Sequence, residues 1–134
     1  MTAPLKSVLI VDDNFSVRAA LRAFFERSMG VEVCEWAGDG CEAVRKAQEH
    51  KPDLVLLDLS MPVMNGLEAA SVIRKTLPHS RIVVFTLYPD KLGQQLAKAA
   101  GVDLVISKAE GAAGLLHALG SLLDPFSQAP QISS

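Results

Sequence analysis

Leu54-Val55-Leu56-Leu57-Asp58 is the stretch that decides the fold, because four consecutive apolar residues run directly into a carboxylate. A short unbroken apolar run is typical of a parallel strand that is covered on both faces. Residues 8–11, 82–85 and 104–106 have the same character. A fifth run, residues 31–36, mixes charged with apolar residues, as expected of an edge strand with one wet side.

Helical patterns fill the gaps between these runs. Apolar residues at 17, 20, 21, 24 and 25 recur at helical spacing. Asp39 and Asp90 are expected to cap two further helices, and Pro52 and Gly101 to end them. A helix over residues 66–76 is predicted from its position between two strands. Strand and helix therefore alternate five times, which predicts one doubly wound α/β domain with a five-stranded parallel sheet.

Length and composition set limits on the function. The chain has 134 residues, 49% of them hydrophobic and 21% charged, with a net charge of −2. We expect one domain over residues 6–123, followed by a flexible polar tail over 124–134. The charge gives no reason to expect nucleic-acid binding by this chain alone. Without an apolar run of about 20 residues, we expect no membrane span and a cytoplasmic protein.

Reactive side chains follow several of the predicted strands. Asp12 and Asp13 follow the first run, Asp58 the 54–57 run, Thr86 the 82–85 run and Lys108 the last. In an open parallel sheet these ends share one edge, where ligands bind. Three close carboxylates favour a hard divalent cation, above all Mg²⁺. A carboxylate nucleophile, a lysine and a hydroxyl together indicate phosphoryl transfer onto an aspartate.

Each of these residues also has a simpler interpretation. Asp12 and Asp13 are placed where they would cap the first helix, and a single threonine or lysine after a strand is usually structural or solvated. Asp58 is harder to explain in this way, because its charge lies directly beside a buried strand. The coincidence of such residues at four strand ends favours the functional interpretation.

The chain resembles the receiver domain of bacterial two-component response regulators. The motifs that carry the resemblance are Asp12-Asp13, DLSMPVMNG at 58–66, Thr86 and Lys108. The resemblance spans about residues 6–123 and implies a flavodoxin-like sheet in the order 2-1-3-4-5. It also implies phosphorylation of Asp58 by a sensor histidine kinase or a small phosphodonor.

The resemblance assigns a role to each matched residue. Asp12, Asp13 and Asp58 would hold Mg²⁺ through their side chains, and Ser60 through its backbone carbonyl. Lys108 would pair with the phosphoryl oxygens, and Thr86 would turn inward to report the modification. The change would shift the domain between two packings around its fourth helix.

Three positions depart from the family pattern. Leu87 replaces a small residue after the switch threonine, Val105 a frequent aromatic residue, and Ala109 a common proline. Leu87 is expected either to crowd the acceptor or to hinder the movement of the threonine. Tyr88, together with Ser60, is expected either to shield the phosphorylated Asp58 from water or to point to solvent.

Three other classes of protein compete with this interpretation. A hydrolase of the haloacid-dehalogenase type needs a second aspartate two positions after the nucleophile, where this chain has Ser60, so a turnover enzyme is not expected. A flavodoxin needs a phosphate loop rich in serine, threonine and glycine, where this chain has Asp12-Asp13-Asn14. A degenerate receiver that serves as a phosphorylation-independent docking module remains the alternative.

The last predicted helix indicates a partner. Between residues 112 and 123, only His117 and Ser121 are polar apart from glycines. This is more apolar than one buried stripe requires. We therefore expect the last two helices to meet a second copy of the chain or a downstream protein. The alternative is a weakly amphipathic surface helix of small residues.

Overall fold

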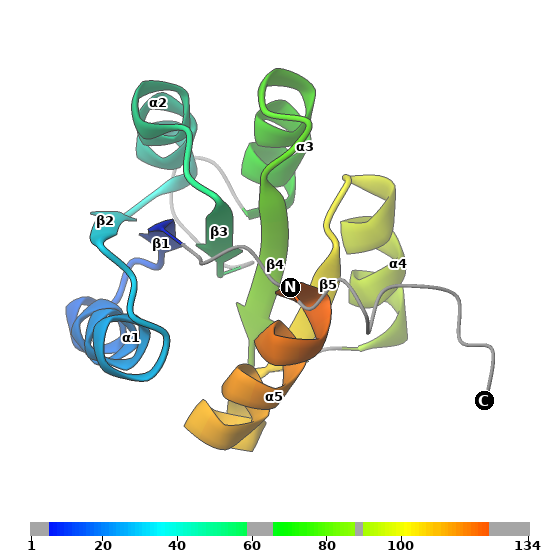
Figure 1. The fold of residues 1–134 in the computed structure, drawn as a ribbon. Coiled ribbons are helices and arrows are strands. Elements are labelled where there is room, and N and C mark those ends of the chain that lie inside the picture. Colours follow the sequence, from blue (N-terminus) through cyan, green and yellow to red (C-terminus); the bar gives the residue numbers. More distant parts are fainter. Residues whose placement is uncertain (1–5, 59–65, 88–89, 124–134) are drawn as a thin grey trace, which may run out of the picture.

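Five short strands form one parallel sheet in the order β2-β1-β3-β4-β5 (Figure 1). The computed structural model describes residues 6–58, 66–87 and 90–123. The strands are β1 (Ser7–Val11), β2 (Val33–Ala37), β3 (Leu54–Leu57), β4 (Arg81–Thr86) and β5 (Leu104–Ser107). The helices are α1 (Phe15–Ser28), α2 (Gly40–His50), α3 (Gly66–Thr76), α4 (Lys91–Ala99) and α5 (Gly111–Leu123), with a 3₁₀ turn η1 (Lys108–Glu110) before α5.

The predicted fold class and strand order are confirmed. The mixed strand β2 lies at one edge of the sheet, as its charged residues predicted. β5 forms the opposite edge, as the strand order that the resemblance implied predicts. Its apolar run also predicted a strand covered on both faces, and in this respect the prediction was wrong. Leu104 and Val105 are only half-buried, since β5 pairs with β4 alone among the described strands.

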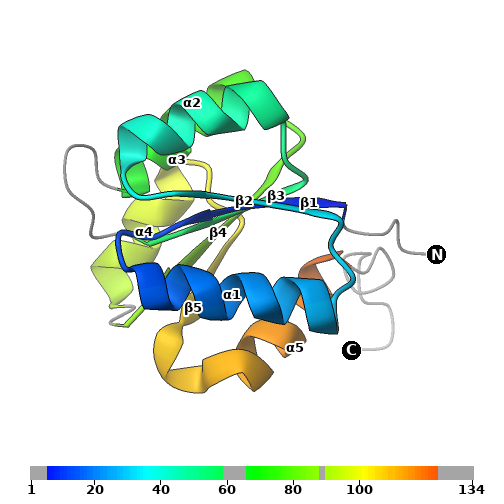
Figure 2. The ribbon, with the colours of Figure 1, turned by 90° about the vertical axis from the view of Figure 1, so that its left-hand side faces the viewer.

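Successive side chains along the central strands point to opposite faces of the sheet, so each face has its own hydrophobic core. One set of strand residues, including Leu9, Val55 and Val84, packs with residues of α2, α3 and α4. The neighbouring set, including Ile10 and Leu56, packs with α1 and α5. Figure 2 shows the sheet between these helix layers, with α1 and α5 together on one side. Because both faces are covered, the buried stretches 8–11, 54–57 and 82–85 of the central strands are apolar.

Side-chain caps fix where several helices begin. Asn14, and neither preceding aspartate, caps α1 by accepting a hydrogen bond from the backbone N–H of Val17. Asp39 caps α2 and Asp90 caps α4, as predicted. These caps satisfy backbone donors that the first helical turn leaves without partners.

The leucines of α4 do not enter the core. Leu92 is 65% exposed and Leu96 is 48% exposed. The small side chain of Ala97 makes the buried contact with the sheet instead. The helix therefore presents an apolar strip to the surroundings, beyond what packing of the domain requires.

An amino-end network lies where β3, β4 and β5 begin. It is made of Arg74, in the last turn of α3, and of Asp53, Ser80 and Asp103, which directly precede these strands. The Arg74 guanidinium donates to the carbonyls of Gly101 and Ser80 and to the carboxylate of Asp103. Asp103 also accepts from the backbone N–H of Ile82 at 2.8 Å. Each charge in this part of the fold therefore meets a donor or acceptor that satisfies it.

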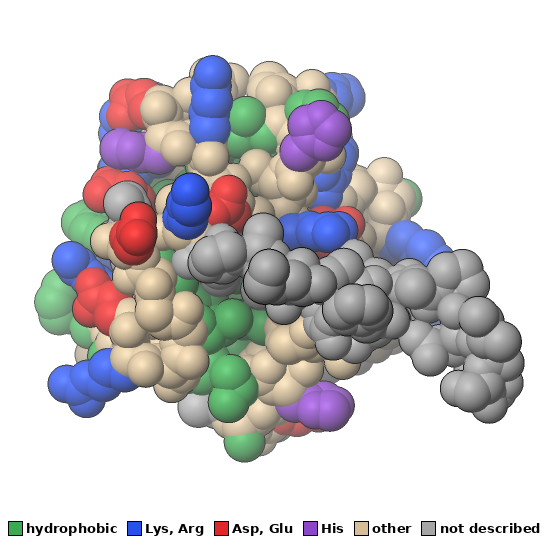
Figure 3. All heavy atoms as spheres, in the orientation of Figure 1, with side chains coloured by type: hydrophobic (Ala, Val, Ile, Leu, Met, Phe, Trp, Pro, Cys, Tyr) green, Lys and Arg blue, Asp and Glu red, His purple; other side chains and the backbone are tan. Residues whose placement is uncertain are grey.

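Charges of both signs are mixed over the surface shown in Figure 3, where red and blue side chains alternate without a stripe of one sign. This pattern agrees with the small net charge of −2. Across the helices that the structure describes, none combines the length and apolar character needed to span a membrane.

Candidate metal and phosphoryl site

Three carboxylates meet where β1 and β3 end. Asp12 and Asp13 directly follow β1, and Asp58 directly follows β3. One oxygen from each carboxylate lies within 4.8 Å of the others. Asp12 is buried, Asp58 half-buried and Asp13 exposed, so the cluster opens to solvent on one side. The parallel register of β1 and β3 produces this meeting, because Val11 pairs with Leu57.

Asp12 is held by four hydrogen bonds. Its N–H donates to the carbonyl of Ala37 at 3.1 Å, and its carbonyl accepts from Arg18 Nη1 at 2.8 Å. One carboxylate oxygen accepts from the N–H of Asn14 and the other from Lys108 Nζ, both at 2.9 Å. These partners come from different parts of the chain, and they fix both the backbone and the carboxylate of Asp12.

Lys108 lies between two of the acids. Its Nζ is 2.9 Å from Asp12 Oδ2 and 3.9 Å from Asp58 Oδ2. Its side chain is 16% exposed, and those of Asp12 and Asp58 are 4% and 14% exposed. The short β5 delivers Lys108 to this edge, where η1 begins. The three carboxylates and the Lys108 ammonium together carry two net negative charges, which one divalent cation would balance. Arg18 is not counted here, because its guanidinium bonds to the Asp12 carbonyl and not to a carboxylate.

The donor set fits a hard cation. Carboxylate oxygens are ligands that Mg²⁺ accepts in small number while it keeps several waters. The exposure of Asp13 leaves a side of the cluster where such waters have room. Asp12, Asp13 and Asp58 are therefore the described residues that are able to hold the ion.

Thr86 lies at the end of β4 and is 9% exposed. It pairs with Ser107 across the β4–β5 ladder, so β4 and β5 end together beside Lys108. Leu87, the next residue, is 56% exposed. A side chain that is mostly in solvent does not fill the space around Asp58, which weighs against crowding of the acceptor.

Two residues with expected roles lie outside the described residues. Ser60, the expected carbonyl ligand, is in the segment 59–65, and Tyr88, the expected shield, is in the segment 88–89. The tail over 124–134 also lies outside them. Their roles stay predictions.

Arg18 is a site residue that sequence reasoning missed. It lies one turn into α1, and its guanidinium reaches back to the Asp12 carbonyl. A partner that is a backbone carbonyl leaves no signature in the sequence. Arg18 is six residues after Asp12, and this spacing does not predict their contact unless the path of the β1–α1 loop is known.

Comparison with known proteins gives a consistent result. Residues 8–120 match the model of the response regulator receiver domain. The response regulator protein VraR of Staphylococcus saprophyticus is 35% identical over 116 residues, which cover 87% of this chain and 55% of that protein. An uncharacterised transcriptional regulatory protein of Bacillus subtilis, YhcZ, is 44% identical over 63% of this chain and 39% of its own length. The chain thus spans about half or less of the length of these relatives.

Solved structures of the same fold are also similar in sequence. A LuxR-family two-component response regulator from Aurantimonas superposes with a TM-score of 0.82 at 33% identity, covering 89% of this chain and 85% of that one. The chemotaxis protein CheY4 of Vibrio cholerae gives a TM-score of 0.82 at 32% identity, with 89% and 99% covered. By its fold, its sequence and the extent of the family match, this chain belongs to the response regulator receiver domain family of two-component signalling proteins.

Proposed function

We propose that this domain accepts a phosphoryl group on Asp58 from a sensor histidine kinase or a small phosphodonor, in a reaction that requires Mg²⁺. The observation that carries the proposal is the meeting of Asp12, Asp13 and Asp58 within 4.8 Å, with Lys108 Nζ between two of them. Such a cluster is costly to a fold, since like charges repel and partly buried charges lose hydration. A role in phosphoryl transfer would account for a cluster of carboxylates that destabilises the fold.

Asp58 is the acceptor in this proposal. Its carboxylate follows β3 directly and is 14% exposed, so a donor is able to reach it. Asp12 and Asp13 would hold the ion together with Asp58, and the Ser60 carbonyl is the further ligand that the family implies. When bound, Mg²⁺ would supply positive charge that offsets the charge of the incoming phosphoryl group. An Asp58 carboxylate oxygen would attack phosphorus, and the bond to the donor's histidine nitrogen or acetate oxygen would break, with its electron pair leaving on the donor.

Lys108 and Thr86 serve the phosphorylated form. A phosphoryl group on Asp58 brings charge and acceptor oxygens next to Lys108. The ammonium is 3.9 Å from Asp58 Oδ2 before the reaction, and its shorter contact is to Asp12. The proposed switch moves Lys108 toward the phosphoryl oxygens and turns the Thr86 hydroxyl inward. These differential contacts are what shift the population between two conformations.

The output is proposed to pass through the surface of α4 and α5. Leu92 and Leu96 on α4 and Leu116 on α5 are exposed. Exposed apolar side chains of this kind suit a second copy of the chain or a downstream protein. The domain itself is not proposed to turn over a substrate, beyond gain and loss of its own phosphoryl group.

Intact mass spectrometry after incubation with acetyl phosphate tests the proposal. The wild type is expected to gain one phosphoryl group with Mg²⁺ and none with EDTA, and Asp58→Ala is expected to gain none in either condition. Asp53→Ala is the matched control, an aspartate at the opposite end of β3 that leaves the acceptor in place. Absence of any gain in the wild type would favour the phosphorylation-independent docking module.

A further inference from the structure

Arg18 joins the acidic site to an aromatic pair on the outer surface of the domain. Its Nη1 donates to the carbonyl of Asp12 at 2.8 Å. Its Cζ lies 4.1 Å from the centre of the Trp36 ring and 5.8 Å from that of Phe15. Both rings are within the range where a guanidinium is attracted to an aromatic face. The same residue thus contacts the metal-site loop and the end of β2.

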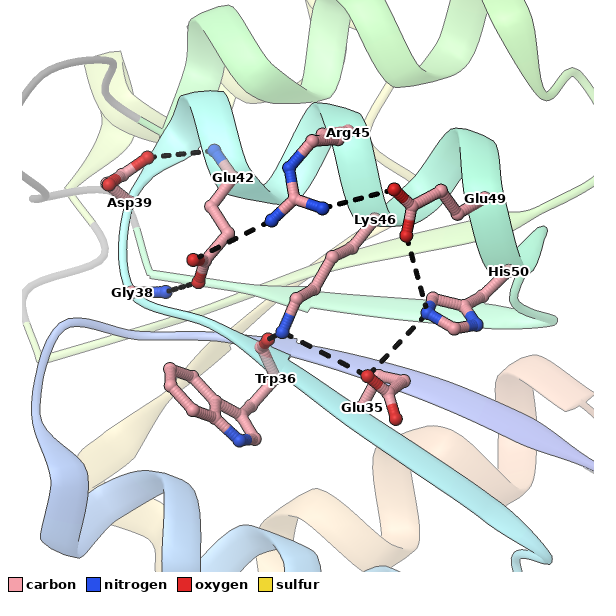
Figure 4. A network of polar contacts seen from close by, with 9 residues as sticks. All are labelled: Glu35, Trp36, Gly38, Asp39, Glu42, Arg45, Lys46, Glu49 and His50. Carbon is pink, nitrogen blue, oxygen red and sulfur yellow. Dashed lines mark hydrogen bonds and ion pairs between the residues drawn. The ribbon is translucent and has the colours of Figure 1, made fainter.

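Trp36 is itself held in place. Its carbonyl accepts a hydrogen bond from Lys46 Nζ at 2.6 Å, and the same ammonium lies 4.6 Å from the ring centre. Figure 4 shows Lys46 extending from α2 to the Trp36 backbone, with Glu35 beside it. Trp36 nevertheless remains 44% exposed. An exposed tryptophan between two cations is not explained by core packing.

Asp12 has a carbonyl whose hydrogen-bond donor among the described residues is Arg18. Three of its four hydrogen bonds hold its N–H and its carboxylate, and the Arg18 guanidinium holds its carbonyl. Asp13 is the next residue along the chain, so the same peptide unit sets the direction of both acidic side chains. Removing the guanidinium would free this peptide, and the carboxylates would then spend less time in one mutual geometry.

We propose that Arg18 is a positioning residue for the Mg²⁺ site: held against Trp36, it fixes the Asp12–Asp13 peptide so that the carboxylates converge. The inference rests on the proposed function, because it concerns the affinity of that site for Mg²⁺. It also makes Trp36 a reporter of the site, since the guanidinium contacts both the ring and the loop. Trp36 is the single tryptophan of the chain.

The sign of the effect separates positioning from charge. Arg18 is a cation near a site for a cation, so its removal would strengthen Mg²⁺ binding if charge alone acted. Loss of a positioning contact has the opposite sign. A hydrogen bond from a charged group contributes enough that its loss weakens binding by about tenfold. Arg18→Ala is therefore expected to bind Mg²⁺ more weakly than the wild type, although it carries one positive charge fewer.

Calorimetric titration with Mg²⁺ alone is the first measurement, on wild type, Arg18→Ala, Arg18→Lys and Arg22→Ala. Arg22→Ala is the matched control, because Arg22 is on the same helix and lines the same pocket as Arg18 and Trp36, but its ion pair is with Glu26. We expect a loss of about tenfold for Arg18→Ala and an intermediate loss for Arg18→Lys, whose ammonium keeps the charge but lacks the planar guanidinium. Arg22→Ala is expected to match the wild type.

The second readout is the change in Trp36 fluorescence emission on addition of Mg²⁺. In a variant that is still folded, lower stability alone does not alter this change. Saturating Mg²⁺ is expected to change the emission of the wild type and of Arg22→Ala, and to leave that of Arg18→Ala unchanged. Circular dichroism verifies that each variant is folded, and Arg18→Gln replaces Arg18→Ala if the latter unfolds. Equal or stronger Mg²⁺ binding by folded Arg18 variants would overturn the inference and leave the metal site intact. Failure of the wild type to bind Mg²⁺ would instead overturn the proposed function.

Discussion

The charged residues at the two ends of the sheet differ in how far partners within the protein balance their charge. At the amino end, Arg74 meets three carbonyls and a carboxylate, and Asp103 accepts from both Arg74 and a backbone N–H. At the carboxyl end, Asp12, Asp13 and Asp58 crowd within 4.8 Å and share one lysine. Charges in the first region are matched and stabilise the fold. Those in the second are mismatched by two negative charges, which leaves a place for a cation.

The difference shows how one fold separates stability from function. Polar groups before the strands lie at helix ends and turns, where backbone donors and acceptors are at hand. Residues after the strands lie at the edge where ligands bind. If partners within the protein neutralised all of their charges, a bound ion would have no charge left to neutralise. The comparison predicts that removal of a carboxylate charge changes stability with opposite signs at the two ends.

Arg74→Ala is expected to have the largest effect. It removes four hydrogen bonds from a side chain that is 25% exposed, and we expect the free energy of unfolding to fall by about 3 kcal/mol. Urea denaturation measures this. Arg45→Ala is the control, because its ion pairs lie at the surface and are expected to contribute less than about 0.5 kcal/mol. Similar losses for both variants would show that the amino-end network has no special part in stability.

Lys108→Ala is expected to come next, with a loss of about 2 kcal/mol in EDTA, because it leaves a nearly buried Asp12 carboxylate without its cation. Mg²⁺ is expected to recover more stability in this variant than in the wild type, since the ion then meets a cluster with one more net negative charge. Lys98→Ala, at an exposed position on α4, serves as the control. Denaturation curves with and without Mg²⁺ provide the comparison, and a Mg²⁺ increment no larger than that of the wild type would contradict it.

Asp13→Asn is expected to have a smaller effect of the opposite sign. Removing one charge from the cluster relieves repulsion, so stability in EDTA should rise by about 0.5 kcal/mol. The gain should shrink in high salt, where exposed charges are screened. A loss of stability, or a gain that salt does not reduce, would show that repulsion at Asp13 is not the cause.

Much of the fold was predictable because it depends on local pattern. The run of residues 54–57 predicted β3, and the charges of residues 31–36 predicted the edge position of β2, which the structure confirms. The carboxyl-end residues were predictable for the same reason, since each directly follows a strand. Asp12, Asp58 and Lys108 are brought together by the parallel sheet and not by proximity in sequence.

Other features were not predictable from the sequence. Arg18 and Arg74 act chiefly on backbone carbonyls, and a carbonyl is present at every residue. The exposure of β5 depends on which strand is last in the sheet, which its apolar residues do not reveal. The outward leucines of α4 depend on Ala97 being small enough to pack closely. Each of these features is set by tertiary packing.

Thermal unfolding of wild type, Asp58→Asn and Asp103→Asn, in EDTA and in saturating Mg²⁺, tests the opposition of the two ends most directly. We expect Asp58→Asn to unfold above the wild type in EDTA and to gain less from Mg²⁺. Asp103→Asn should unfold below the wild type in EDTA and keep the full wild-type increment from Mg²⁺. If Asp58→Asn unfolds below the wild type in EDTA, or gains as much from Mg²⁺ as the wild type does, the carboxyl-end acids are not an unbalanced cluster awaiting a cation, and the account is contradicted.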